Sequence, residues 1–199
     1  MLYIIAAASG TGKTSLTLAL AQTMSSIKIS ISHTTRSIRV GETPDKHYFF
    51  VSEYEFLELV RQGVFFEHAK VFGHYYGTSR HIVEKELCQG NDVILDIDWQ
   101  GARQIKKQIE CRSIFLLPPS YNELKLRLEK RKRDDLQIIE ERLQIARSEV
   151  SHLKEFDYIV INDKFEDALL NLQSIVRTER LLLKNQLVRH SKLIEELIV

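Results

Sequence analysis

Apolar segments that suit strands alternate with amphipathic segments that suit helices along much of the chain. Residues 2–6 form an uninterrupted apolar run, which is typical of a strand covered on both faces of a parallel sheet. A turn containing glycine follows, and then a helical stretch passes through Leu16, Leu18 and Leu20. Strands of the same character are predicted at residues 93–97, 113–117 and 158–161, each before helix-forming sequence. This order predicts an α/β fold with a doubly wound, mostly parallel sheet.

The pattern changes between residues 32 and 78, where aromatic and β-branched residues are interleaved with turn residues. This texture predicts a small β-rich insertion into the α/β core. Within it, Ser52 and Glu55 form a capping-box pattern, which predicts a short helix that runs to about Gln62 and stops at Gly63. The aromatic side chains of the insertion need no functional role, since aromatic residues commonly pack against one another.

Helical sequence dominates the last third of the chain. Residues 121–154 are predicted to be helical apart from a charged stretch at 130–135, which is too polar to be buried and predicts a mobile surface segment. Beyond Phe165 an amphipathic pattern runs to the C-terminus, and we expect an extended helix there. Its part beyond Leu181 either packs on its own domain or pairs with a second subunit, so a homo-oligomer is one expectation.

Composition narrows the class of protein. A chain of 199 residues that is 44% hydrophobic suits a single compact α/β enzyme. The net charge is only +1, so no overall excess of positive charge indicates a nucleic-acid partner. Cys88 and Cys111 have neither CxxC spacing nor a histidine pattern, which argues against a zinc site or a disulfide framework and favours a reduced, cytoplasmic setting.

No targeting or membrane segment is expected. The apolar start of the chain has no preceding Lys or Arg and leads into a glycine turn, unlike a signal peptide. No stretch approaches the roughly 18 apolar residues that a membrane-spanning helix needs. The sequence therefore predicts a soluble protein without a membrane partner.

Residues 7–14, with the sequence AASGTGKT, lie between the first predicted strand and helix, as a P-loop requires. Backbone N–H groups of such a loop point at the β- and γ-phosphates of a nucleotide, while Gly10 and Gly12 allow backbone angles that other residues avoid. Lys13 would neutralise charge on the transferred phosphoryl group, and Thr14 would place its hydroxyl on magnesium. Ala7 replaces the first glycine of the general pattern, so a glycine-rich turn with an incidental lysine stays open.

Two further clusters suit a second phosphate-bearing substrate. Arg36 and Arg39, next to hydroxyl and imidazole groups, form a plausible phosphate clamp whose natural guest is a nucleoside monophosphate, although an exposed basic loop would look alike. Asp96 and Asp98 follow the apolar part of a strand and project from the carboxyl edge of the sheet, where ligands bind in open α/β folds. Asp96 would suit magnesium or its waters and Asp98 the second substrate, unless one of them merely caps a helix.

Three runs resemble the monophosphate site of the guanylate kinase family in order and spacing: FEHA at 66–69, GHYYGTS at 73–79 and ILDIDWQG at 94–101. The resemblance extends from residue 2 to about 181, and the family's own P-loop resembles this one at Ala7. It implies an enzyme that uses ATP and Mg²⁺ to phosphorylate GMP or dGMP. It also implies a GMP site formed by Ser32, Arg36, Arg39, Tyr48, Glu67, Tyr76, Thr78 and Asp98.

The chemistry of that implied site is consistent with guanine. A carboxylate such as Glu67 can accept hydrogen bonds from N1 and N2 of guanine at once, whereas adenine would leave it unpaired. Hydroxyls of Ser32 and Thr78 would lie near the guanine carbonyl. The phosphate would be held by Arg36, Arg39, Tyr48 and Tyr76.

The resemblance likewise implies residues for ATP and for catalysis. The ATP site would consist of Ala8, Ser9, Gly10, Thr11, Gly12, Lys13, Thr14, Ser15, Arg127 and Asn162, with Thr14 and Asp96 toward the metal. Catalytic charge would come from Lys13, Arg39, Arg131 and Arg142, the last two on a lid that closes over ATP. The basic run 130–133 could instead be read as a nucleic-acid or localisation patch, but acidic residues follow it at once. Lys130 and Lys132 stand where the family usually has glycine.

These expectations divide the chain into a core with the P-loop (1–31), a GMP-binding subdomain (32–88), more core (89–126), a helical lid (127–142), and a last part with core and C-terminal helix (143–199). Two other functions remain open. A guanylate-kinase-like protein-binding module would have lost catalysis, and a P-loop kinase for a phosphorylated sugar would not need Glu67.

Overall fold

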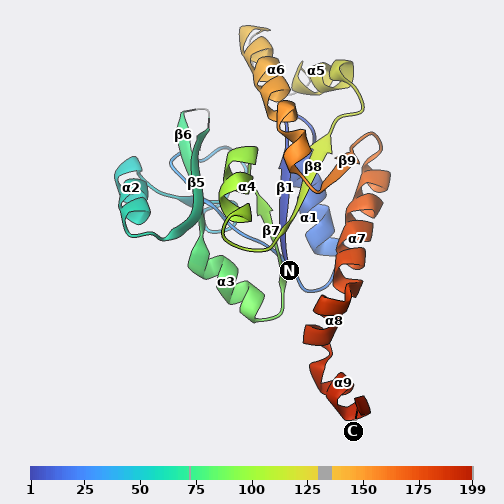
Figure 1. The fold of residues 1–199 in the computed structure, drawn as a ribbon. Helices are drawn as coiled ribbons and strands as arrows, with labels where there is room; N and C mark the ends of the chain where they lie inside the picture. The colour runs from blue at the N-terminus through green and yellow to red at the C-terminus, as the bar shows by residue number, and fades with distance from the viewer. Residues whose placement is uncertain (72, 130–135, 199) are drawn as a thin grey trace.

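A central five-stranded parallel sheet with helices on both faces forms the body of the protein (Figure 1). The computed structural model describes residues 1–71, 73–129 and 136–198. In sheet order the strands are β2 (Ile27–Ile29), β7 (Asp92–Asp96), β1 (Leu2–Ala7), β8 (Arg112–Leu117) and β9 (Tyr158–Ile161). The predicted α/β fold with a parallel sheet is confirmed. Strand β2 was not predicted, because three residues are too few to show a period.

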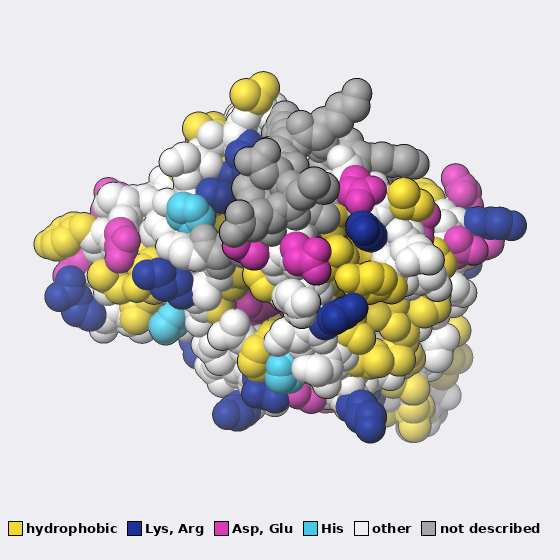
Figure 2. Space-filling view, turned by 90° about the horizontal axis from the view of Figure 1, so that it is seen from above, with side chains coloured by type: hydrophobic (Ala, Val, Ile, Leu, Met, Phe, Trp, Pro, Cys, Tyr) yellow, Lys and Arg dark blue, Asp and Glu magenta, His cyan; other side chains and the backbone are white. Residues whose placement is uncertain are grey.

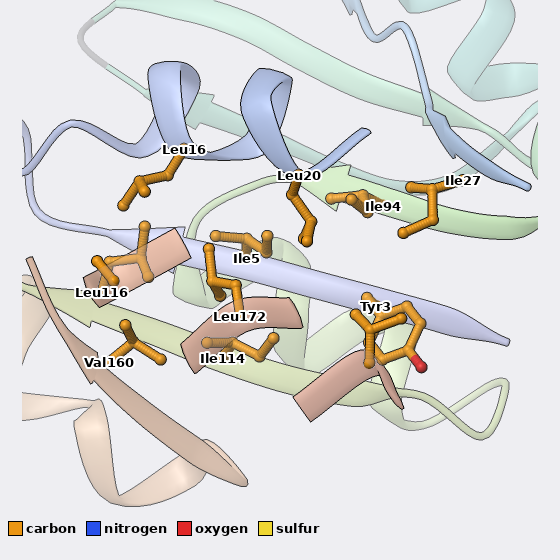
Figure 3. Packing of buried hydrophobic residues seen from close by; sticks show 12 residues of the cluster. Tyr3, Ile5, Leu16, Leu20, Ile27, Ile94, Ile114, Leu116, Val160 and Leu172 are labelled. Atoms are coloured by element: carbon orange, nitrogen blue, oxygen red, sulfur yellow. The ribbon is translucent and has the colours of Figure 1, made fainter. Parts of the chain in front are cut away.

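The apolar run of β1 reflects its position in the middle of the sheet. Tyr3 and Ile5 point to one face, where α1 (Lys13–Thr23) and α7 (Phe165–Leu181) cover them (Figure 3). Leu2 and Ile4 point to the other face, in a cluster that includes residues of α3 (Arg80–Cys88) and α4 (Trp99–Lys106). Successive side chains of a strand alternate between faces, so a strand buried on both sides is apolar throughout.

A smaller mixed sheet forms beside the core, as the β-rich texture predicted. Its order is β4 (Phe49–Phe50), β3 (His33–Thr34), β6 (His74–Ser79) and β5 (Phe65–Val71), with β6 antiparallel to both of its neighbours. Helix α2 (Glu53–Arg61) belongs to this part, and both halves of the Ser52–Glu55 capping box are present. The predicted end of this helix is confirmed, since its C-cap is Gln62 and Gly63 follows in a left-handed conformation.

Helices α5 (Tyr121–Glu129) and α6 (Leu136–Ser151) lie at the end of the molecule where the parallel strands finish, and the short 3₁₀ helix η1 (Leu153–Glu155) follows (Figure 1). Side chains of both helices, including Leu128 and Leu143, pack around Ala8 just after β1. Both helices therefore pack directly against the loop that follows β1. The charged stretch 130–135 lies outside the described residues, so its mobility stays a prediction.

The predicted extended C-terminal helix is wrong: the segment forms α7, α8 (Leu183–Arg189) and α9 (Ser191–Ile198). Leu182, between the first two, has an extended backbone with ψ 136°. Side-chain amides stabilise this break, because Asn185 Nδ2 donates to the Glu179 carbonyl and Gln186 Nε2 to the Arg180 carbonyl, each at 2.7 Å. Helices α8 and α9 contain no buried residue and extend away from the core (Figure 1).

Figure 2 views the molecule from the end that carries α5 and α6, and shows basic and acidic side chains interspersed. No continuous basic surface is visible among the side chains coloured there. In the part of the chain that the structure describes, no helix combines the length and apolar character needed to span a membrane.

Candidate active site

A cleft of about 570 Å³ lies where the carboxyl ends of the parallel strands meet the smaller sheet and α6. Parallel α/β sheets place their ligands at this edge. The cleft brings together most residues of the predicted site, namely Ala8, Ser9, Gly10, Thr11, Gly12, Lys13, Thr14, Ser15, Ser32, Arg36, Arg39, Tyr48, Glu67, Tyr76, Asp96, Asp98 and Arg142. Thr78, Arg127 and Asn162 do not line it, and Arg131 lies outside the described residues.

Two glycines shape the phosphate loop. Gly10 and Gly12 have φ of 92° and 94°, in the left-handed region that side chains disfavour. A Cβ on Gly12 would also lie 2.7 Å from Nδ2 of Asn162, whose amide donates to the Thr11 carbonyl at 2.6 Å. Helix α1 begins immediately afterwards without a side-chain cap, so its first N–H groups stay available to an anion.

Lys13 is paired within the protein. Its ammonium group forms an ion pair with Asp96 at the end of β7 and lies 3.5 Å from the Ile97 carbonyl oxygen. Burial lowers the pKa of Lys13, but the Asp96 carboxylate outweighs burial and raises the pKa above its ordinary value. Lys13 is therefore positively charged at neutral pH.

The predicted phosphate clamp is organised by a carboxylate that was not predicted as part of the site. Glu42 Oε1 accepts from Arg36 Nη2 at 2.7 Å, while its Oε2 accepts from the backbone N–H of Arg39 at 2.8 Å. The Arg36 guanidinium also donates to the Ser37 carbonyl at 2.8 Å and lies 5.3 Å from the Tyr48 ring centroid. Glu42 thus fixes the direction of one arginine and the turn that carries the other.

Glu67 is a buried carboxylate, only 3% exposed, on β5. The Thr78 hydroxyl on β6 donates to its Oε1 at 2.5 Å. Burial raises the pKa of Glu67 to about 7, opposed by the Thr78 hydrogen bond. Thr78 does not line the cleft, so its contribution is to hydrogen-bond the Glu67 carboxylate and oppose the rise in its pKa.

Asp98 has a structural role as well as a place in the cleft. It is the N-cap of α4, where its Oδ1 accepts from the Gly101 N–H at 2.9 Å. The helix-capping alternative therefore holds for Asp98, while its side chain still lines the cleft.

Arg127 and Asn162 lie next to each other behind the phosphate loop. Arg127 Nη1 donates to the Asn162 carbonyl at 3.0 Å, and its Nε donates to Glu123 at 2.8 Å. Asn162 is itself buried and supports Thr11. A direct contact of either residue with ATP stays a prediction.

One face of α6 adds residues that were not predicted. Glu141, Ile145 and Glu149 line the cleft together with the predicted Arg142. The intervals of three and seven residues from Arg142 to Ile145 and Glu149 place them on one helical face, so this periodicity was an available signal. Burial raises the pKa of Glu149 to about 7, with Lys13 opposing the shift, and its Oε2 is buried without a hydrogen-bond partner.

The side chains of the cleft suit magnesium that is bound together with nucleotide phosphates better than a metal whose ligands all come from the protein. Within residues 1–71, 73–129 and 136–198, no three His, Cys, Asp or Glu side chains form a metal-binding group. Magnesium bound with nucleotide phosphates typically needs one or two protein carboxylates and keeps several waters. The hydroxyl of Thr14 and the carboxylate of Asp96, both in the cleft wall, fit that requirement.

Known proteins with the same organisation identify the family. A family model described as guanylate kinase matches residues 1–179. The chain belongs to the guanylate kinase family. The guanylate kinase of Haemophilus ducreyi is 50% identical over 200 residues, which cover 99% of this chain and 97% of that protein, and the one from Escherichia coli strain K12 is 49% identical with the same coverage.

A solved structure supports the same relationship at the level of the fold. The crystal structure of guanylate kinase from Anaplasma phagocytophilum has a TM-score of 0.78 and is 32% identical, covering 92% of this chain and 87% of that one. The family resemblance inferred from the sequence is therefore confirmed.

Proposed function

We propose that the protein is an ATP:GMP phosphotransferase, which transfers the γ-phosphate of ATP to GMP and releases GDP and ADP. One observation carries the proposal: a single cleft contains a phosphate loop with Lys13 and, across from it, the buried carboxylate Glu67 beside a phosphate clamp. The relatives named above are guanylate kinases, which supports the same reaction here. Since dGMP has the same base and phosphate, it is proposed as a second acceptor.

GMP would bind between the smaller sheet and the start of α4. Glu67 would accept from the N1 and N2 hydrogens of guanine, with Ser32 near the guanine carbonyl and Asp98 at the edge of the site. Thr78 would hold the carboxylate in place. Adenine offers no such donor pair, so AMP would leave a buried carboxylate unpaired, which strongly disfavours binding.

The GMP phosphate would be held by Arg36, Arg39, Tyr48 and Tyr76. Arginine suits this role because its planar fork matches phosphate oxygens. Arg39 is also proposed as a catalytic cation, because it would lie beside the phosphate that accepts the transferred group.

ATP would bind with its phosphates on the backbone N–H groups of residues 8–15 and with Lys13 beside the transferred group. Thr14 and Asp96 would hold Mg²⁺, which would neutralise charge on the phosphates. Arg127 and Asn162 would support the ATP side of the loop from behind.

Arg131 and Arg142 would add positive charge as the predicted lid closes over ATP. Closure would exclude water, so that the phosphoryl group passes to GMP instead of solvent. No covalent enzyme intermediate is required, because positioning of the two nucleotides and electrostatic stabilisation supply the catalysis.

Acceptor choice tests the proposal. Purified protein with ATP and Mg²⁺ is given GMP, dGMP, AMP, CMP or UMP, and we expect turnover with the guanine nucleotides to exceed the others by orders of magnitude. Equal turnover of GMP, AMP, CMP and UMP would refute the guanine assignment. Calorimetry that detected no ATP binding would favour the non-catalytic module, and undiminished activity of Glu67→Ala on a sugar phosphate would favour the sugar-phosphate kinase.

We further propose that the enzyme works in the cytoplasm, without a nucleic-acid or membrane partner. The two free cysteines and the interspersed surface charges support this (Figure 2). The exposed apolar side chains of α8 and α9, such as Leu183 and Leu197, suit contact with a second copy of the chain. Sedimentation of the purified protein tests for such an oligomer.

A further inference from the structure

Gly101 occupies an unusual position for a glycine. It lies in the first turn of α4, with its N–H bonded to the N-cap Asp98, and it does not have the positive φ that explains Gly10 or Gly12. Glycine is among the least favourable residues inside a helix, and alanine among the most favourable. The reason for a glycine here must therefore lie in what surrounds it.

The space beside Gly101 is filled by Glu67. A Cβ at residue 101 would lie 2.6 Å from Glu67 Oε2, 3.1 Å from Glu67 Cδ and 3.2 Å from Ile97 Cδ1. The first distance is well inside van der Waals contact. An alanine would therefore require the carboxylate to move.

Glu67 has little freedom to move. Its Oε1 is held by the Thr78 hydroxyl at 2.5 Å, and the side chain is almost completely buried. Its strand, β5, pairs with β6 and packs against α4. Since both the helix and the strand are fixed, the missing side chain of Gly101 creates the room that Oε2 occupies.

We propose that Gly101 is a specificity-determining residue, because its missing side chain lets the Glu67 carboxylate lie where it recognises the acceptor base. This inference rests on the proposed function, in which Glu67 reads the guanine edge. It assigns to α4 a steric role in choosing the base, separate from the capping role of Asp98. The P-loop and the ATP side are not involved.

The test is Gly101→Ala, assayed with GMP, AMP and ATP. Displacing the carboxylate from a paired geometry should raise KM for GMP about tenfold or more and lower the preference for GMP over AMP by a similar factor. KM for ATP at saturating GMP should change less than about twofold, because the substitution lies away from the phosphate loop. Lys107→Ala, at the exposed end of the same helix, is the control and should behave as the unmodified protein.

A thermodynamic cycle with Glu67→Ala separates a clash with Glu67 from general damage to the helix. Gly101→Ala should lower the melting temperature in the natural background, but should raise it in the Glu67→Ala background, where only the flexible end of Ile97, 3.2 Å from the new Cβ, opposes the gain in helix propensity. If Gly101→Ala lowers stability equally in both backgrounds, the clash is with another group and the inference is overturned. If Gly101→Ala alone does not fold, the melting temperatures of Glu67→Ala and of the double variant can still be compared.

The outcomes distinguish the inference from the function on which it rests. If Glu67→Ala keeps the preference for GMP over AMP, then Glu67 does not read the base and the role of Gly101 is overturned with it, while transfer to GMP itself stands. Equal turnover of GMP and AMP by the natural protein would instead refute the proposed function. If Glu67→Ala loses that preference while Gly101→Ala keeps both the preference and the KM for GMP, then the role of Gly101 alone is refuted.

Discussion

Replacing Glu67 with glutamine isolates the free-energy cost of burying a carboxylate at this position in the cleft wall. Glutamine has nearly the same shape, and its carbonyl oxygen can still accept from the Thr78 hydroxyl that now bonds Glu67 Oε1. It carries no titratable group. The variant therefore removes the charge while leaving the packing around Gly101 almost unchanged.

The sign of the effect follows from the direction of the pKa shift. Burial raises the pKa of Glu67 from 4.5 to about 7, so between these pH values the folded protein binds more protons than the unfolded chain. The contribution of Glu67 to the free energy of unfolding then falls as pH rises and reaches its full penalty above pH 7. A shift of about 2.5 pH units corresponds to about 3 kcal/mol.

Urea denaturation at several pH values between 5 and 8.5 measures this effect. We expect Glu67→Gln to gain stability relative to the natural protein as pH rises, by up to about 3 kcal/mol at pH 8. Glu149 is unchanged in both proteins, so its own raised pKa cancels in the difference. Parallel stability curves for the two proteins would refute the reasoning.

Glu55→Gln provides a control of opposite sign. Glu55 is exposed, and hydrogen bonds from Ser52 lower its pKa. A lowered pKa contributes stability at higher pH that is lost as pH falls through the folded-state pKa. Relative to the natural protein, this variant should therefore lose stability only as pH rises toward 4.5, and between pH 5 and 8.5 the two stability curves should run parallel.

Four further predictions concern ligand binding and turnover. Lys13→Ala should lower kcat by about 10²-fold or more in a coupled ADP assay, because a charge beside the transferred phosphoryl is lost. Glu42→Ala should raise KM for GMP about tenfold in steady-state kinetics, because Arg36 loses the partner that fixes its direction. A lower KM for GMP would instead mean that the Glu42 carboxylate competes with the GMP phosphate for Arg36. GMP binding at pH 6 should release up to about one proton, because Glu67 ionises when it binds guanine, and the affinity for GMP should fall as pH drops below about 7. Calorimetry in buffers of different ionisation enthalpy measures the proton release, and a binding enthalpy that does not depend on the buffer would contradict it. Gly12→Ala should lower both the melting temperature and ATP affinity, because it places a Cβ 2.7 Å from a buried amide at a φ of 94°.

Features governed by local pattern were predictable from the sequence. The strand before the P-loop and the capping box of α2 each depend on residues close together in the chain. The end of α7 at Leu182 was not predictable in the same way. The apolar period continues through this position, and the break depends on side-chain amides of later residues reaching back to free carbonyls.

The candidate site shows the same division. The glycines and Lys13 of the phosphate loop form a contiguous motif, so sequence alone located them. Glu42 and Glu149 were not assigned to the site, because their importance comes from contacts across a turn and between α6 and the loop. Gly101 was visible in the sequence, but its reason is a 2.6 Å approach to a strand 34 positions earlier.

Two cations of the cleft are each paired with a carboxylate of the protein, which lowers the free-energy cost of burying their charge. Lys13 is paired with Asp96, and Arg36 with Glu42, so neither cation lacks a counter-charge before a nucleotide arrives. Asp96 is also the proposed metal ligand. If Asp96 held magnesium, Lys13 would be released to pair with phosphate, so that one ion pair would replace another. We therefore expect ATP and metal to bind in a mutually dependent way, with Asp96→Asn weakening the effect of Mg²⁺ on ATP affinity more than it weakens ATP binding itself, because a single carboxylate links the two partners.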